Sequence, residues 1–146
     1  MSASFGTFLA ETRKVRYHER SDKLKFEAGG EGRRKMTTVK FHTYPDGRIS
    51  MTVSGHAGFA PRGQDILCAA VSVLTLTAAQ TAGELQRKNL LQQEAVTVLQ
   101  EGFACITLRP KAHARGQARA AFRVILTGMR LLARSYPQYV QVNGRV

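Results

Sequence analysis

The chain has 146 residues, 43% of them hydrophobic, which is enough to bury the core of one ordinary domain. Lys and Arg number 22 against 10 Asp and Glu, and the net charge of +12 favours contact with polyanions, of which nucleic acid is the commonest. Two cysteines and a beginning without a long apolar stretch argue against a secreted, disulfide-rich protein. We therefore expect a cytoplasmic protein with free thiols.

Residues 1–35 show little hydrophobic periodicity and end in a stretch rich in glycine and charge. They hold nine Lys or Arg and five acidic residues, and their apolar surface is too small to offset the entropy of ordering. We predict a flexible basic extension over residues 1–35 and a folded domain over residues 36–146. Met36 opens the first well-patterned segment, so an alternative is that the physiological product starts there.

Two segments with apolar residues at every second position follow, over residues 37–44 and 48–54. Between them, Pro45-Asp46-Gly47 combines a fixed backbone dihedral with a residue that accepts positive φ. This pattern predicts a β-hairpin whose second strand ends just before Gly55 and His56.

A helix is predicted to begin at Ile66, with Asp65 as its N-cap, and to end within the polar stretch 83–89. The uncharged run 66–83 approaches the length of a membrane span, but its Ser, Thr and Gln residues favour a helix buried in a soluble protein, without a membrane partner. Helical spacing predicts an inner face made of Ile66, Ala69, Ala70, Val73, Leu74 and Thr77. Because Leu67 and Val71 are apolar too, we expect most of the helix to be covered, partly by a second subunit.

The rest of the chain predicts a second hairpin over residues 96–107, with Cys105 pointing inward, and a second helix over residues 117–136. The inner face of this helix is predicted to hold Phe122, Ile125, Met129 and Leu132, and its outer face Arg119, Arg123, Arg130 and Arg134. Pro137 ends the helix, and a short strand follows over residues 139–142. The element order is ββαββαβ, which predicts an α+β domain with an antiparallel sheet and two main helices.

His56 and Cys68 are the candidate catalytic residues, because a thiol at the start of a helix lies beside unpaired amides and the positive end of the helix dipole. A nearby histidine can stabilise the thiolate and then protonate a leaving amine. The amides of Leu67 and Cys68 are candidates for binding an oxyanion. By spacing alone, a loop histidine and a small buried cysteine remain the commoner interpretation.

Four further residues are candidates for supporting the site or binding substrate: Gly55, Gly63, Asp65 and Ser72. Helix capping explains Asp65 as well as a catalytic role does, and Ser72 is equally well explained by helix packing. The loop between Gly58 and Gly63 suits either a lid over bound peptide or a plain surface loop. The other histidines have no partners at ligand spacing, so we expect no metal and no cofactor.

The sequence Gly-His-Ala at 55–57, followed by Gly-Gln-Asp-Ile-Leu-Cys-Ala-Ala-Val-Ser at 63–72, closely resembles the signature of the ribosomal-processing cysteine protease family, Prp. The resemblance extends from Met36 to the C-terminus through the order of elements. Leu67 stands where the family pattern has Val, a small change in volume. The extension of 35 residues and the charge of +12 are departures from the family pattern.

The resemblance implies an endopeptidase that removes an N-terminal extension from large-subunit ribosomal protein twenty-seven, with Cys68 and His56 as its catalytic dyad. It also implies a compact homodimer and cleavage after paired aromatic residues, before a small residue that leads into a basic run. The alternative function is a non-catalytic RNA- or ribosome-binding module that uses the arginines at 119–134. For the peptidase, the arginines are either a solvated face of the helix, which is the favoured interpretation, or the site of a weak contact with RNA or the ribosome.

Overall fold

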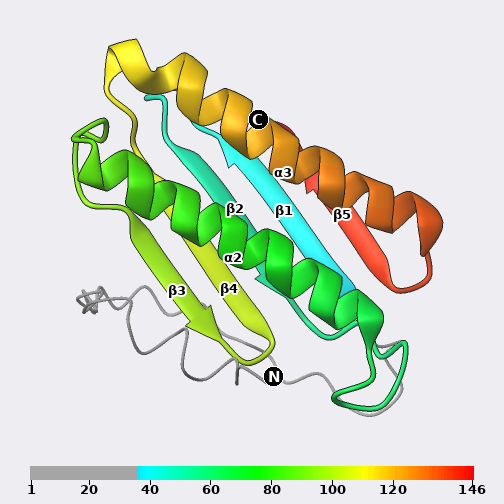
Figure 1. Cartoon of the computed structure of the whole chain (residues 1–146). Helices are drawn as coiled ribbons and strands as arrows, with labels where there is room; N and C mark the ends of the chain where they lie inside the picture. Colours follow the sequence, from blue (N-terminus) through cyan, green and yellow to red (C-terminus); the bar gives the residue numbers. More distant parts are fainter. Residues whose placement is uncertain (1–35) are drawn as a thin grey trace, which may run out of the picture. The chain divides into compact units, whose positions relative to one another are not determined.

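The computed structural model describes residues 36–146, in which five strands form one sheet and two long helices lie on one of its faces (Figure 1). The predicted extension over residues 1–35 lies outside the described residues. The strands are β1 (Thr37–Thr43), β2 (Ile49–Ser54), β3 (Val96–Gln100), β4 (Phe103–Leu108) and β5 (Val140–Gly144). The helices are α2 (Ile66–Arg87), the short 3-10 helix η1 (Ala112–Ala114) and α3 (Arg115–Ser135). The predicted order ββαββαβ is confirmed.

The strands are arranged in the order β3-β4-β2-β1-β5. The pairs β1–β2, β2–β4 and β3–β4 are antiparallel, as predicted, but β5 runs parallel to β1, so the sheet is mixed. The reason is the path of α3, which crosses back over the sheet face before a short connection returns the chain to the start of β1. There the backbone N–H of Thr37 donates to the carbonyl of Tyr139 at 2.9 Å.

The core lies between the sheet and the two helices. From the sheet it takes alternate residues such as Val39 and Met51, and from α3 it takes Phe122 and Met129, all fully buried. Burying each such side chain contributes about 1.5–3 kcal/mol. The predicted inner face of α3 is confirmed, since Ile125 is also buried and Leu132 packs against the core.

The predicted inner face of α2 is wrong. Ile66 and Val73, which were expected to point inward, are 58% and 55% exposed. The buried face instead contains Leu67, Val71, Thr75, Ala78, Ala82 and Leu85. Because apolar residues surround nearly the whole helix, their spacing does not define which side meets the sheet.

The predicted orientation of β4 is also wrong. The residues buried under the helices are Ala104, Ile106 and Leu108, so Cys105 lies on the opposite face of the sheet and is half-buried. Its sulfur lies 4.0 Å from the Thr52 hydroxyl and 3.9 Å from the Thr107 hydroxyl. Both faces of β4 carry apolar side chains, and the face with the larger number of them is buried in the core.

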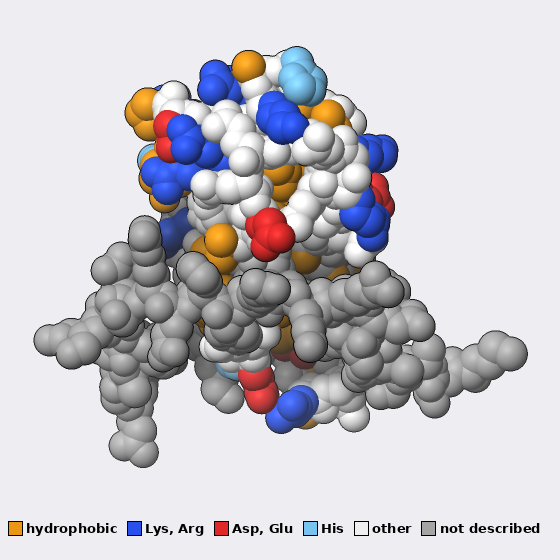
Figure 2. Space-filling view, turned by 90° about the vertical axis from the view of Figure 1, so that its left-hand side faces the viewer, with side chains coloured by type: hydrophobic (Ala, Val, Ile, Leu, Met, Phe, Trp, Pro, Cys, Tyr) orange, Lys and Arg blue, Asp and Glu red, His pale blue; other side chains and the backbone are white. Residues whose placement is uncertain are grey.

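Among the described helices, α2 alone is long and apolar enough to cross a membrane by length and composition, with a mean hydropathy of 1.6. One of its sides packs on the sheet, and the opposite side is exposed. On the β3 side of the molecule, shown in Figure 2, Lys and Arg side chains are distributed among uncharged ones. The described residues all belong to one compact unit, residues 34–146.

Candidate active site

The site is built where β2 ends and α2 begins, and Asp65 holds the start of α2. Its backbone is extended, and its Oδ1 accepts hydrogen bonds from the amides of Leu67 at 3.0 Å and Cys68 at 2.9 Å. The predicted N-cap is therefore confirmed. These bonds satisfy two of the orphan amides of the first helical turn and fix Cys68 in that turn.

The second oxygen of Asp65 holds the loop that leads into the helix. Oδ2 accepts the amide of Phe59 at 3.0 Å and that of Ala60 at 3.5 Å. Partial burial opposes ionisation of Asp65, but the hydrogen bonds from Cys68, Ala60 and Phe59 outweigh it and lower the pKa of the carboxyl below its usual value. One ionised carboxylate thus connects the loop to the helix.

Two further contacts hold the loop in place. The Phe59 ring packs edge-to-face on Tyr136 and Tyr139, with ring centroids 5.6 Å and 5.3 Å apart. Arg62 forms an exposed ion pair with Glu101 in the β3–β4 turn, at 3.2 Å. The loop is therefore in contact with both the α3–β5 connection and the β3–β4 turn, which favours a defined position over a plain surface loop.

Cys68 is half-buried, and the pKa of its thiol is raised above its usual value. Burial raises the pKa of the thiol, and the hydrogen bond and negative charge of Asp65 raise it further. The backbone N–H groups of Ala57 and Gly58 interact with the sulfur and lower the pKa, but they do not reverse the shift. The helix start was expected to favour the thiolate, but burial first and the Asp65 carboxylate second raise the pKa of the thiol instead.

The prediction that the amides of Leu67 and Cys68 bind an oxyanion also needs correction. The amides of Leu67 and Cys68 are already bonded to Asp65, so they are not free to bind an oxyanion. The amides beside the sulfur are those of Ala57 and Gly58. Sequence reasoning missed their part in the site, although the glycines flanking His56 were a signal of close backbone approach.

His56 is exposed and lies over the β3–β4 turn. A Cβ added to Gly102 would stand 2.8 Å from the His56 Nε2 atom, so the imidazole rests directly on this glycine. The amide of Gly55 donates to the Gly102 carbonyl at 2.9 Å, and a Cβ on Gly55 would collide with the Met36 carbonyl. Within residues 36–146, no hydrogen bond joins the imidazole to the Cys68 thiol.

A family model of the cysteine protease Prp matches residues 36–141. The chain belongs to this family. The Prp family match begins at Met36, the residue at which the predicted peptidase domain starts.

A curated relative, the ribosomal processing cysteine protease Prp of Mycoplasma pneumoniae, is 33% identical over 95 residues, which cover 65% of this chain and 86% of the relative. The chain is therefore a hydrolase, a cysteine protease of the ribosomal-processing type.

Solved structures support the fold. The Prp of S. aureus with a covalently linked product peptide matches with a TM-score of 0.57 at 19% identity, over 74% of this chain and 98% of that one. The same enzyme with a substrate peptide gives a TM-score of 0.54 at 16% identity, over 74% and 98%. A Streptococcus mutans protein gives 0.54 at 24% identity, over 77% and 97%.

The remaining candidate residues lie around the Prp signature without a defined contact. Ser72 is exposed one helical turn after Cys68, and Gly63 lies in the exposed loop with open space around its Cα. No group of three or more His, Cys, Asp or Glu in residues 36–146 could hold a metal ion. The sequence predicted a turn at Gly102, but it predicted neither the contact of Gly102 with His56 nor the aromatic contacts of Phe59.

Proposed function

We propose that this Prp-family protease removes an N-terminal extension from large-subunit ribosomal protein twenty-seven, with Cys68 as nucleophile and His56 as general base and acid. The observation that carries the proposal is the arrangement at Cys68, a half-buried thiol in the first turn of α2 with the Ala57 and Gly58 amides at its sulfur. The name of the M. pneumoniae relative, a ribosomal processing cysteine protease, supports the class of substrate.

In the proposed reaction, His56 accepts the thiol proton and the Cys68 sulfur attacks the carbonyl carbon of the scissile peptide bond. The Ala57 and Gly58 amides donate to the carbonyl oxygen as it becomes an oxyanion. The imidazolium returns its proton to the leaving amine, which departs as the C–N bond breaks and a thioester forms. A water molecule, deprotonated by His56, then hydrolyses the thioester and restores the thiol.

The neutral thiol of the free protein fits a protease that is activated by its substrate. Because burial and Asp65 raise the Cys68 pKa, the resting enzyme carries little thiolate at neutral pH. A peptide that moves His56 towards the sulfur would supply the missing base. This keeps an intracellular thiol unreactive until a substrate is bound.

The aromatic cluster at the loop supports cleavage after aromatic residues. Phe59, Tyr136 and Tyr139 are in edge-to-face contact, and the Phe59 amide is bound to the same carboxylate as the Cys68 amide. Aromatic rings prefer such edge-to-face partners. An aromatic side chain of the substrate could pack against these rings close to Cys68.

The proposed working form is a cytoplasmic homodimer, in which the exposed apolar sides of the two helices meet. Four large apolar side chains are more than half exposed there: Ile66, Val73, Val124 and Leu131. Leu74, next to Val73, packs on Gly128, which lies between Val124 and Leu131 on α3. The four residues therefore flank the α2–α3 seam, and exposed large apolar side chains gathered in this way are typical of an interface.

The decisive experiment is cleavage of the host's own ribosomal protein precursor by the wild type, by Cys68→Ala and by Cys105→Ala, followed by mass spectrometry of the products. We expect one cut at the extension junction by the wild type and by Cys105→Ala. Cys68→Ala should lose at least about 10³-fold in rate, because the nucleophile is absent. Equal cleavage by Cys68→Ala, or a wild type that cuts other peptides but leaves this precursor intact, would contradict the proposal.

A further inference from the structure

A hollow lies at the end of the sheet opposite to His56. Its volume is about 860 Å³, and it is formed by the ends of β1 and β5 and by the outer side of α3. His56 follows the end of β2, which is antiparallel to β1, so the hollow and the peptidase site are at opposite ends of the strands. The residues that line it are Phe41, His42, Thr43, Tyr44, Pro45, Arg119, Arg130, Gly144, Arg145 and Val146.

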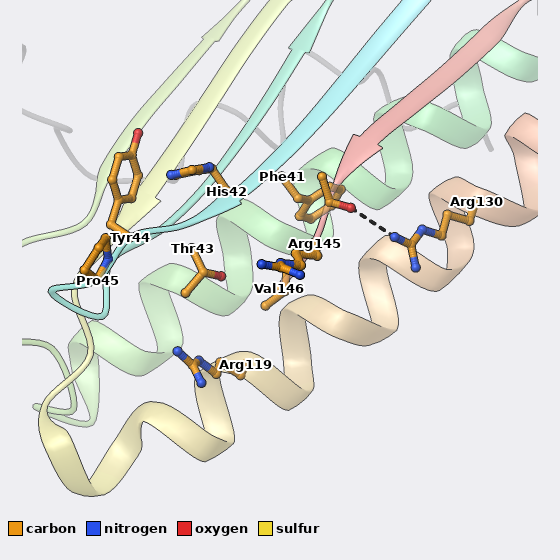
Figure 3. A pocket seen from close by; sticks show the side chains of 10 residues that line it. Phe41, His42, Thr43, Tyr44, Pro45, Arg119, Arg130, Arg145 and Val146 are labelled. Carbon is orange, nitrogen blue, oxygen red and sulfur yellow. Dashed lines mark hydrogen bonds between the residues drawn. The ribbon is translucent and has the colours of Figure 1, made fainter.

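The charged side chains that line the hollow are all basic. Three arginines line it, Arg119 and Arg130 from α3 and Arg145 after β5, and no Asp or Glu does (Figure 3). Arg130 donates to the Gly144 carbonyl at 3.0 Å. Within residues 36–146, neither Arg119 nor Arg145 has an ion-pair partner. The guanidinium groups of Arg119 and Arg145 and the remaining N–H groups of Arg130 are therefore left to bind an anion from outside the protein.

An unpaired hydroxyl lies in the same hollow. The Oγ1 atom of Thr43 is buried and has no hydrogen-bond partner among the described residues. Figure 3 shows this hydroxyl turned towards Arg145 and Val146. A buried polar group without a partner is uncommon in proteins and calls for an explanation. A ligand oxygen that reached the arginines would provide the missing partner.

Aromatic rings form the other wall. The rings of His42 and Tyr44 meet edge-to-face with centroids 4.3 Å apart, and the guanidinium of Arg48 lies over the Tyr44 ring at 4.4 Å. His42 is exposed and Tyr44 is half-buried. Rings beside guanidinium groups are a combination with which proteins hold single-stranded nucleic acid, with bases stacked and phosphates paired.

We propose that this hollow binds the sugar-phosphate backbone of single-stranded RNA, with Arg119, Arg130 and Arg145 on phosphates and Thr43 on a phosphate oxygen. Arg119 and Arg130 are eleven residues apart on α3, about 16 Å along the helix axis, so one phosphate group cannot reach both. The span favours a chain of phosphates over a free anion. Arginine suits this role because its planar donors pair with two phosphate oxygens at once.

RNA binding would hold the protease near the particle on which a ribosomal protein assembles, without a role in the cut itself. The two activities are separable, since no residue of the hollow belongs to the loop 57–64 or to the helix start. Loss of RNA binding would thus leave the proposed cleavage intact, and loss of cleavage in Cys68→Ala would leave RNA binding intact.

The test is fluorescence anisotropy with a labelled uridine dodecamer and the full chain at several salt concentrations. We compare Arg119→Gln/Arg145→Gln with Arg87→Gln/Arg134→Gln, a control that removes the same charge outside the hollow. The first variant should bind roughly tenfold more weakly and lose about 1.4 from its salt slope, whereas the control should stay within about twofold of the wild type. Thr43→Val should also weaken binding.

Three results would overturn the proposal. One is absence of binding at low salt. Another is equal loss in the two double variants, which would mean general charge rather than a site. The third is equal or tighter binding of inorganic polyphosphate or poly-glutamate, which would point to a phosphate polymer without bases or to an acidic protein. Peptide cleavage by both double variants serves as the check that they are folded.

Discussion

Gly102 determines where the candidate base can stand. The His56 ring rests on it, and the glycine has a φ of +72° at the tip of the β3–β4 turn. A side chain there would have to displace either the imidazole or the turn. We infer that Gly102 is a positioning residue, which acts through His56 rather than on the substrate.

We predict that Gly102→Asn lowers kcat by about 10- to 100-fold with little change in KM, because Asn tolerates positive φ while its Cβ displaces the imidazole. The matched control is Gly47→Asn in the β1–β2 turn, where φ is +87° and the nearest atoms belong to the flexible Arg115 side chain. Steady-state kinetics and the pH profile of kcat/KM test the prediction. A variant with normal kcat would show that His56 is positioned by other contacts.

At the scale of elements, Asp65 joins the loop, the helix start and the nucleophile through a single carboxylate. Its lowered pKa means that its interactions stabilise the fold fully above the ordinary value of 3.8 and are lost as pH falls through the lower folded-state value. The contribution is therefore present at neutral pH and disappears only in acid.

We predict that Asp65→Ala lowers the free energy of unfolding at neutral pH by about 1 kcal/mol or more, because the cap of α2 is lost. Asp65→Asn should cost less, since Asn is also a good N-cap, but its amide nitrogen cannot accept the loop amides. Urea unfolding at neutral pH and below pH 3.8 tests this: both variants should lose less stability in acid than the wild type. Equal stability of all three proteins at neutral pH would contradict it.

The hairpins, both helices and the His56 and Cys68 segment could be predicted because their signals are local. Turn residues, period-two alternation and the Asp65 cap lie within a few residues of the elements they define. The orientation of β4 and the inner face of α2 could not, because apolar residues occupy both sides of each and only tertiary packing decides between them. The pairing of β5 with β1 and the contact of the His56 ring with Gly102 could not be predicted either, because each joins residues that are distant in sequence.

At the scale of the whole molecule, the apolar patch along the α2–α3 seam faces outward while the sheet side of both helices is buried. Val124 is 72% exposed and Leu131 is 51% exposed. Such a surface in an isolated domain is an association or aggregation liability unless a partner covers it.

We predict that Val73→Asp/Leu131→Asp converts the proposed homodimer to a monomer, because burying four carboxylates across a two-fold interface is costly. The control is Val96→Asp on β3, which is 52% exposed and lies away from the seam. Light scattering coupled to gel filtration gives the masses. A monomeric wild type, or a dimer lost only in the Val96 variant, would show that the seam is not the interface.

The parallel pairing of β5 with β1 has a practical consequence for handling the protein. The chain leaves the sheet beside Arg145 and Val146, at the end of the strands opposite to His56. A purification tag fused after Val146 would thus leave the peptide-cutting end clear while filling the basic hollow. Cleavage measurements would tolerate such a fusion, but RNA titrations would need it removed, or they would report the tag instead of the protein.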